Sequence, residues 1–199
     1  MPDGNQSKIG LRERKKMKTK ATIQRNALRL FREQGYQATT VEQIAEVSEI
    51  SPSTFFRYFA TKEAVVLEDD FDPLLIETYC KQPRELSPIE AFRKALREGF
   101  SQIPEEERIE LWDRISLSMS IPELRASMLQ QVTDAADLIA TIIGERQGCD
   151  AADLKVRTLA GAFVSVLLSA QAHYLQHPER EFVDIADEAL ALMEAGFPL

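Results

Sequence analysis

Helical periodicity runs along almost the whole chain, and this pattern limits the fold more than any other feature. Apolar residues recur three or four positions apart, as in the stripe formed by Ile23, Ala27, Leu30 and Phe31. No segment alternates apolar and polar residues with the period of two that a half-buried strand needs. We therefore predict an all-α fold of about nine helices.

Capping residues, prolines and glycines divide the chain into these helices. Thr40 with Gln43, and Ser87 with Glu90, fit the capping-box pattern. We expect Gly144 and Gly148 to end the helix that begins at Pro122, and Asp150 to cap the next one. Residues 1–10 have no periodic pattern and predict a disordered tail. The predicted helices are 11–34, a two-turn helix after Thr40, 52–59, 62–80, 88–102, 105–120, 122–143, 151–176 and 179–195.

Charge is distributed unevenly between the two ends of the chain. The formal net charge is −8, which argues against a nucleic-acid partner. However, residues 1–62 carry 12 Lys and Arg against 6 Asp and Glu, while residues 63–199 carry 12 against 26. The alternative is a solvated surface with chance asymmetry. We favour a basic domain, residues 1–62, that meets phosphate, and an acidic second domain, residues 63–199.

The basic domain contains the pattern of a helix-turn-helix, in which the second of two short helices enters the major groove of DNA. Phe55, Phe59 and part of Tyr58 face inward in the helix that begins at Pro52. Short hydroxyls, an apolar ring and a guanidinium then face a partner, and these groups suit base edges, thymine methyls and guanine. Those outward residues are Ser53, Thr54, Phe56 and Arg57. Thr40 and Lys62 lie at helix starts, where phosphate binds favourably.

The stretch GYQATTVEQIAEVSEISPSTFFRYFATKEAV, residues 35–65, resembles the N-terminal signature of the TetR family. The resemblance implies two helix-turn-helix heads on an all-helical, ligand-binding homodimer that binds double-stranded DNA. By position, the family's DNA-contact residues fall on Thr40, Ser53, Thr54, Phe56, Tyr58 and Lys62. With Ser51 and Arg57 added, these are our candidate DNA-binding residues. Repression is the default activity in this family.

Two features of the basic domain need separate interpretation. The family turn usually carries Gly where this chain has Glu49, and a positive φ at that position would cost Glu about 1 kcal/mol more than Gly. The basic run from Arg12 to Lys20 is either a frayed, solvated helix end or an arm that contacts phosphates or the minor groove. We favour the arm, because the run adjoins the helix-turn-helix.

The predicted helix 151–176 carries a stripe of small residues, Gly161, Ser165 and Ser169, with His173 next on the same face. Small side chains allow another helix to approach closely. In the TetR family, which this chain resembles, the last two long helices of each protomer form a four-helix dimer interface. Ordinary internal packing is the alternative for this stripe.

The segment from Trp112 to Gln131 is similar to the body of a TetR subgroup that includes regulators of the mycofactocin system. This resemblance implies an elongated, fatty-acyl effector such as an acyl-CoA. Arg114 and Arg125 would then meet its acidic groups, or else form surface ion pairs. The candidate ligand-binding residues, each of which could instead be plain core, are Phe100, Trp112, Ile115, Met119, Met128 and Phe163.

No catalytic signature is present, so we expect no enzyme activity and no cofactor. Cys80 and Cys149 lack metal-binding spacing, and His173 and His177 fit surface histidines better than metal ligands. We expect a cytoplasmic protein without a membrane span. The competing hypothesis is a helical small-molecule carrier that does not bind DNA. If the chain is a regulator, we expect the predicted helix 62–80 to transmit effector binding to the basic domain.

Overall fold

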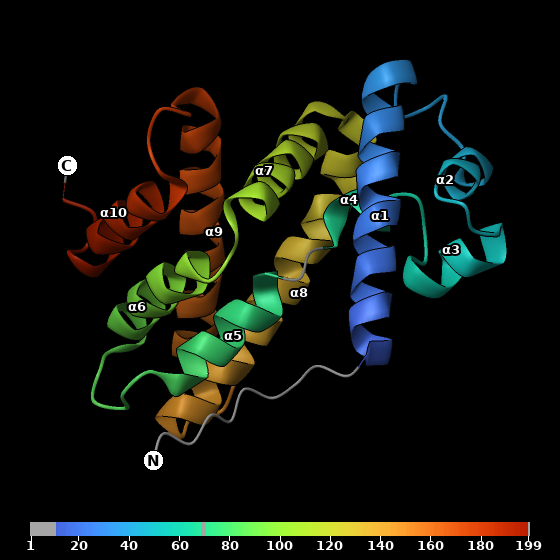
Figure 1. Cartoon of the computed structure of the whole chain (residues 1–199). Helices are drawn as coiled ribbons and strands as arrows, with labels where there is room; N and C mark the ends of the chain where they lie inside the picture. Colours follow the sequence, from blue (N-terminus) through green and yellow to red (C-terminus); the bar gives the residue numbers. More distant parts are fainter. Residues whose placement is uncertain (1–10, 69–70, 199) are drawn as a thin grey trace, which may run out of the picture.

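The computed structural model describes residues 11–68 and 71–198, and every regular element in those ranges is an α-helix (Figure 1). The all-α prediction is therefore confirmed. The predicted tail, residues 1–10, lies outside the described residues. The ten helices of the described part are α1 (Leu11–Gln34), α2 (Val41–Val47), α3 (Pro52–Tyr58), α4 (Ala64–Leu67), α5 (Phe71–Lys81), α6 (Pro88–Ser101), α7 (Glu105–Ser120), α8 (Pro122–Gln147), α9 (Leu154–Gln176) and α10 (Phe182–Glu194).

The predicted single helix over residues 62–80 is wrong, because this segment forms two helices, α4 and α5. Pro73 explains the break. It lies in the first turn of α5, where a missing N–H costs nothing. Inside one continuous helix its ring would clash with the carbonyl four residues earlier. This division raises the number of helices in the described part from the expected nine to ten.

The end of α8 also differs from the expectation. Gly148 ends the helix with a left-handed φ of 67°, as predicted, but Gly144 lies inside it. A Cβ at position 144 would lie 2.9 Å from the carbonyl oxygen of Cys149, so glycine allows the following loop to cross the helix closely. The cap of α9 is Asp153, which accepts from the backbone N–H of Lys155, and not Asp150.

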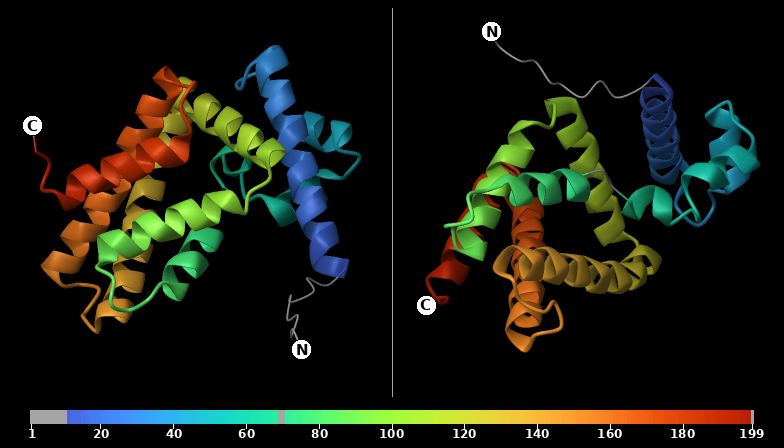
Figure 2. Two further views of the ribbon diagram at one scale, coloured as in Figure 1. Left: turned by 60° about the vertical axis from the view of Figure 1, so that its left-hand side comes forward. Right: turned by 90° about the horizontal axis from the view of Figure 1, so that it is seen from below.

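Two hydrophobic cores divide the molecule. The core of the head is built from α1, α2 and α3, together with Val65 and Val66 of α4 and Leu124 of α8. The body core is built from α5, α6, α8, α9 and α10. Figure 2 shows the head beside the body, with α4 and α7 between them. Helix α4 therefore packs in the core of the head and lies where the head meets the body.

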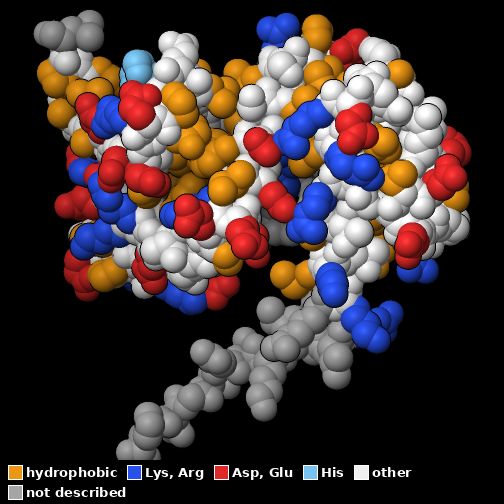
Figure 3. All heavy atoms as spheres, turned by 45° about the horizontal axis from the view of Figure 1, so that its top comes forward, with side chains coloured by type: hydrophobic (Ala, Val, Ile, Leu, Met, Phe, Trp, Pro, Cys, Tyr) orange, Lys and Arg blue, Asp and Glu red, His pale blue; other side chains and the backbone are white. Residues whose placement is uncertain are grey.

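Ion pairs also connect the head to the body. Arg25 and Arg32 of α1 pair with Glu110 and Asp113 of α7, at 2.9 and 2.8 Å. Figure 3 shows Lys and Arg side chains gathered where the head meets the body, with Asp and Glu side chains next to them. The orientation of the head thus depends on the contact between α4 and α7 and on these charged bridges.

Candidate DNA-binding head and effector cavity

Local capping fixes the two helices of the helix-turn-helix. Thr40 caps α2 and forms the predicted capping box with Gln43. The hydroxyl of Ser51 caps α3 by accepting from the backbone N–H of Thr54 at 3.1 Å, and Pro52 occupies the first helical position. Together these caps define where α2 and α3 begin.

The turn between α2 and α3 requires a left-handed residue, and that residue is Glu49, with φ 55°. The N–H of Ile50 donates to the carbonyl of Ala45, and the N–H of Glu49 to that of Glu46, each at 3.0 Å. This pair of bonds is the Schellman motif, whose left-handed position is usually glycine. Position 49 therefore has the positive φ at which, as argued from the sequence, glutamate costs more than glycine. The amide of Asn26, on α1, also donates to the carbonyl of Val47 and secures the end of α2.

The candidate DNA-binding residues of α3 divide into exposed and packed side chains. Ser53, Phe56 and Arg57 are exposed, and Phe56 has 54% of its surface open to solvent. Thr54 and Tyr58 are half-buried, and Tyr58 packs against the head core. The exposed face of α3 therefore combines a hydroxyl, an aromatic ring and a guanidinium, as base recognition requires.

The hydroxyls at the start of α3 form a cluster. The Oγ of Ser51 lies 2.9 Å from the Oγ of Ser53 and 2.9 Å from the Oγ1 of Thr54. All three side chains lie at the N-terminus of α3, where free N–H groups favour an anion such as phosphate.

The side chain of Lys62, which we expected to contact a phosphate, forms hydrogen bonds within the head. Its ammonium donates to the carbonyls of Tyr36 and Thr39, at 2.9 and 3.0 Å, and lies 4.1 Å from the centre of the Tyr36 ring. The Tyr36 hydroxyl donates to the carboxylate of Glu63 at 2.5 Å, and this bond lowers the pKa of Glu63. Burial, followed by the contact with Glu63, raises the pKa of Tyr36. These residues tie the loop after α1 to the start of α4.

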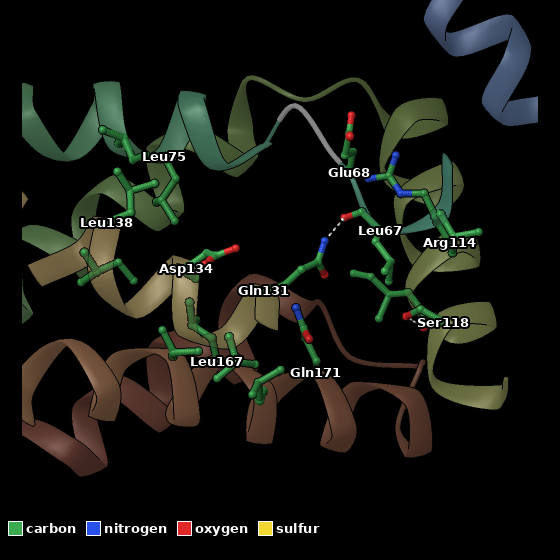
Figure 4. Close-up of a pocket in the computed structure, with 18 of the residues that line it drawn as sticks. Leu67, Glu68, Leu75, Arg114, Ser118, Gln131, Asp134, Leu138, Leu167 and Gln171 are labelled. Carbon is green, nitrogen blue, oxygen red and sulfur yellow. Dashed lines mark hydrogen bonds between the residues drawn. The ribbon is translucent and has the colours of Figure 1, made fainter. Parts of the chain in front are cut away.

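A cavity of about 480 Å³ lies among α4, α5, α7, α8 and α9 (Figure 4). Its apolar walls include Leu75, Leu138 and Leu167. Polar side chains line the rest, among them Ser118, Gln131, Asp134 and Gln171, with Lys20, Glu68 and Arg114 toward the head. The size and the mixed lining suit a small organic ligand with apolar and polar parts.

Three of the six residues proposed from the sequence as ligand contacts pack in the body core, and one lines this cavity. Ile115 lines the cavity, while Met119 is half-buried and is not part of the wall. Phe163 is fully buried and stacks on Phe92, with ring centres 4.5 Å apart. Phe100 and Trp112 pack against Phe182. The side chain of Met128 lies outside the described residues. Of the two arginines considered, Arg114 lines the cavity and Arg125 is exposed.

The amide side chains of the cavity were missed by the sequence reasoning. Gln131 faces the cavity and donates to the carbonyl of Leu67, at the end of α4, at 3.1 Å (Figure 4). Gln171 faces it from α9. For Gln171 the available signal was a polar side chain beside Leu167 and Leu168 on an apolar face of α9, which in a plain core would be costly to bury.

Helix α9 presents its small-residue stripe outward. A Cβ at Gly161 would meet nothing within 4 Å, and Ser165 and Ser169 are exposed. Together with Leu192 and Phe197, which are also exposed, the serines border a shallow groove between α9 and α10. In the described part of the chain, α9 is also the one helix long and apolar enough to cross a membrane. It packs against α8 and α10, so an apolar face on each side accounts for its composition.

The two histidines stay close together without a third ligand. The rings of His173 and His177 lie 4.4 Å apart, and the Nδ1 of His177 lies 3.3 Å from a carboxylate oxygen of Glu179. Within residues 11–68 and 71–198 no group of three His, Cys, Asp or Glu could hold a metal ion.

Comparison with known proteins identifies the class that this head and body define. Residues 23–68 match the model of bacterial regulatory proteins of the tetR family, and residues 86–198 match the MftR C-terminal domain. The chain belongs to the TetR family of transcriptional regulators, which have a helix-turn-helix DNA-binding domain and a ligand-binding C-terminal domain.

Individual relatives agree with this assignment. The chain is 32% identical to the HTH-type transcriptional regulator TcmR of Streptomyces glaucescens, over 90% of this chain and 84% of that protein. It is 29% identical to a Mycobacterium tuberculosis protein named as a mycofactocin biosynthesis transcriptional regulator, MftR, over 96% of each chain. It therefore also has the predicted resemblance to mycofactocin regulators.

A solved structure extends the likeness to the whole fold. The crystal structure of Thermus thermophilus FadR, a TetR-family transcriptional repressor in complex with lauroyl-CoA, is similar with a TM-score of 0.56 and 25% identity. The match covers 90% of this chain and 95% of that one.

Proposed function

We propose that this chain is a homodimeric repressor whose two heads, residues 1–62 of each protomer, bind a palindromic operator and are released by an effector in the body. The observation that carries the proposal is the position of α4. Val66 and Leu67 line the cavity, while Val65 and Val66 belong to the core of the head. A ligand in the cavity therefore touches the same helix that supports the DNA-binding head. The protein would act in the cytoplasm, without catalysis, and residues 63–199 would form the effector-binding and dimerisation domain.

The DNA contact is proposed for the exposed face of α3, with Ser51, Thr54 and Thr40 toward phosphate. Fluorescence anisotropy on the DNA upstream of the gene tests it. We expect Arg57→Ala to relax base discrimination by about 1–3 kcal/mol, because an arginine can fork onto a guanine. Arg84→Ala, at an exposed position after α5, is the matched control and should bind like the unaltered protein. A protein that binds effector but no DNA at low salt would be the carrier of the competing hypothesis.

The dimer is proposed to form through α9 and α10. Two recognition helices can dock together only if they lie about 34–36 Å apart, one turn of DNA, so the pairing of the bodies sets operator binding. Since a side chain at Gly161 has open space within the protomer, Gly161→Glu should leave each chain folded and yield monomers in analytical ultracentrifugation. Thr141→Glu, at an exposed position of α8, is the control and should remain dimeric.

The proposed effector is an acyl thioester such as an acyl-CoA. Support comes from the lauroyl-CoA in the related Thermus thermophilus repressor and from the cavity itself, which joins apolar walls to a polar end formed by Lys20, Glu68 and Arg114. Thermal unfolding with lauroyl-CoA tests this, because a ligand that binds only the folded state raises the melting temperature. Coenzyme A alone is the control for binding through the nucleotide. Equal melting temperatures with and without lauroyl-CoA would contradict the acyl effector.

A further inference from the structure

Two glutamine side chains, one from α1 and one from α8, donate to backbone carbonyls of α4 and of its C-cap. The helix is four residues long, so its last carbonyls lack helical partners. The amide of Gln24, on α1, donates to the carbonyls of Val65 and Glu68, at 3.3 and 3.0 Å. The amide of Gln131, on α8, donates to the carbonyl of Leu67 at 3.1 Å. One glutamine therefore holds α4 from the head and the other holds it from the body.

Gln131 differs from Gln24 because it also lines the effector cavity (Figure 4). We propose that Gln131 is the residue that converts effector binding into movement of the head. The Gln131 amide has two N–H donors, so a hydrogen-bond acceptor on the effector breaks the bond to Leu67 only where it turns the amide away from α4; neither N–H then reaches the carbonyl of Leu67. This inference rests on the proposed function, since it assigns a role within the same cavity.

The consequence for α4 follows from the cost of an unpaired carbonyl. Leu67 is half-buried, so water does not readily replace Gln131 as the donor to its carbonyl. An unpaired carbonyl raises the free energy of the present position of α4 relative to a position in which water reaches the helix end. An effector that binds the second position better shifts the equilibrium toward it, by no more than its difference in affinity. Gln131 thus selects effectors that carry an acceptor, such as a thioester or ketone oxygen. A plain hydrocarbon fills the cavity without freeing α4.

The first experiment needs no effector. Gln131→Glu keeps the size of the side chain but removes the N–H donor, and Gln171→Glu makes the same change elsewhere in the cavity wall. We measure hydrogen exchange of the amides of residues 64–68 and affinity for the operator. For Gln131→Glu we expect faster exchange and operator binding about five-fold weaker, the effect of one neutral hydrogen bond. Exchange and affinity equal to those of Gln171→Glu would overturn the proposal.

The second experiment compares two probes that differ only in the acceptor. Lauroyl-CoA has a thioester carbonyl, whereas S-dodecyl-CoA is a thioether of similar length without it. We expect both to bind and lauroyl-CoA to release the operator at least five-fold more effectively, a difference that Gln131→Glu abolishes. Equal release of the operator by both probes would show that Gln131 does not respond to an acceptor on the effector. If neither probe binds, the acyl effector is wrong, and the exchange of residues 64–68 decides the role of Gln131.

Discussion

Glu49 offers the sharpest test of how this helix-turn-helix is built. Its φ of 55° places a side chain with a Cβ in the left-handed position of a Schellman motif. For an L-residue this conformation costs about 1–2 kcal/mol, from which the larger entropy loss of glycine on folding, about 0.5–1 kcal/mol, must be subtracted. We therefore expect Glu49→Gly to stabilise the protein by about 0.5–1 kcal/mol per protomer.

A second substitution separates backbone conformation from charge. Glu49→Gln removes the carboxylate but leaves a Cβ at the same φ. Any interaction of the carboxylate with the start of α3 is lost in both variants, so the difference in stability between them reports the backbone alone. Thermal melts at one protomer concentration provide the measurement, and a gain of 1 kcal/mol corresponds to about 2–4 °C in a chain of this size.

The same two variants measure the effect of this negative charge on DNA binding. Glu49 is exposed and lies two residues before Ser51, the N-cap of α3. Loss of its charge should tighten operator binding in both variants at low salt, and the gain should shrink as salt rises. Equal stability of the Gly and Gln variants would refute the conformational reasoning. Tighter binding by the Gly variant alone would refute the electrostatic reasoning.

Three further substitutions test the head and the body. Because the hydrogen bond from Tyr36 lowers the pKa of Glu63, its stabilisation is present above the unfolded pKa of about 4.3 and is lost as pH falls through the lowered value. Melts from pH 3 to 7 should show Glu63→Gln less stable at neutral pH, with a deficit that vanishes in acid. Gly144→Ala should destabilise by about 1–3 kcal/mol in urea titrations, since its Cβ would press on the backbone at Cys149. Tyr79→Phe should stabilise by about 1 kcal/mol by the same assay, because that fully buried hydroxyl has no hydrogen-bond partner among the described residues; a loss of stability would contradict this.

The helices could be predicted where their ends carry local signals. The capping boxes at Thr40 and Ser87 act within four residues, so the sequence contains their whole cause. Pro73 carried an equally local signal, and weighing it would have separated α4 from α5. The mixed chemistry of the exposed α3 face was also predictable, because the inward side of a short helix follows from its period.

The cavity could not be predicted in the same way. Large rings bury the most surface when they pack together, so Phe100, Trp112 and Phe163 close the space around them. The cavity remains where branched aliphatic and amide side chains from several helices face one another, as with Gln131 and Gln171. Which faces meet depends on the packing of α4, α5, α7, α8 and α9, and no single segment contains that information.

The positive charge of residues 1–62 also has a structural role. Residues 1–62 have an excess of positive charge, but Arg25 and Arg32 pair with acidic residues of α7 and so orient the head. Both partners of the Arg32–Asp113 pair are half-exposed, which limits its value to about 0.2–1 kcal/mol. We therefore expect Arg32→Asp to weaken operator binding by up to about five-fold, through the position of the head.

A charge swap distinguishes orientation from direct contact with DNA. If Arg32 acts through Asp113, the double variant Arg32→Asp with Asp113→Arg restores the ion pair and with it the operator affinity measured by anisotropy. If Arg32 contacts phosphate itself, the swap leaves the binding weak. The ion pair also lies on the helix that carries Arg114 and Ile115 of the cavity wall, so its loss should reduce the effect of effector on operator affinity. An unchanged effector response in Arg32→Asp would mean that the Arg32–Asp113 pair takes no part in connecting the cavity to the head.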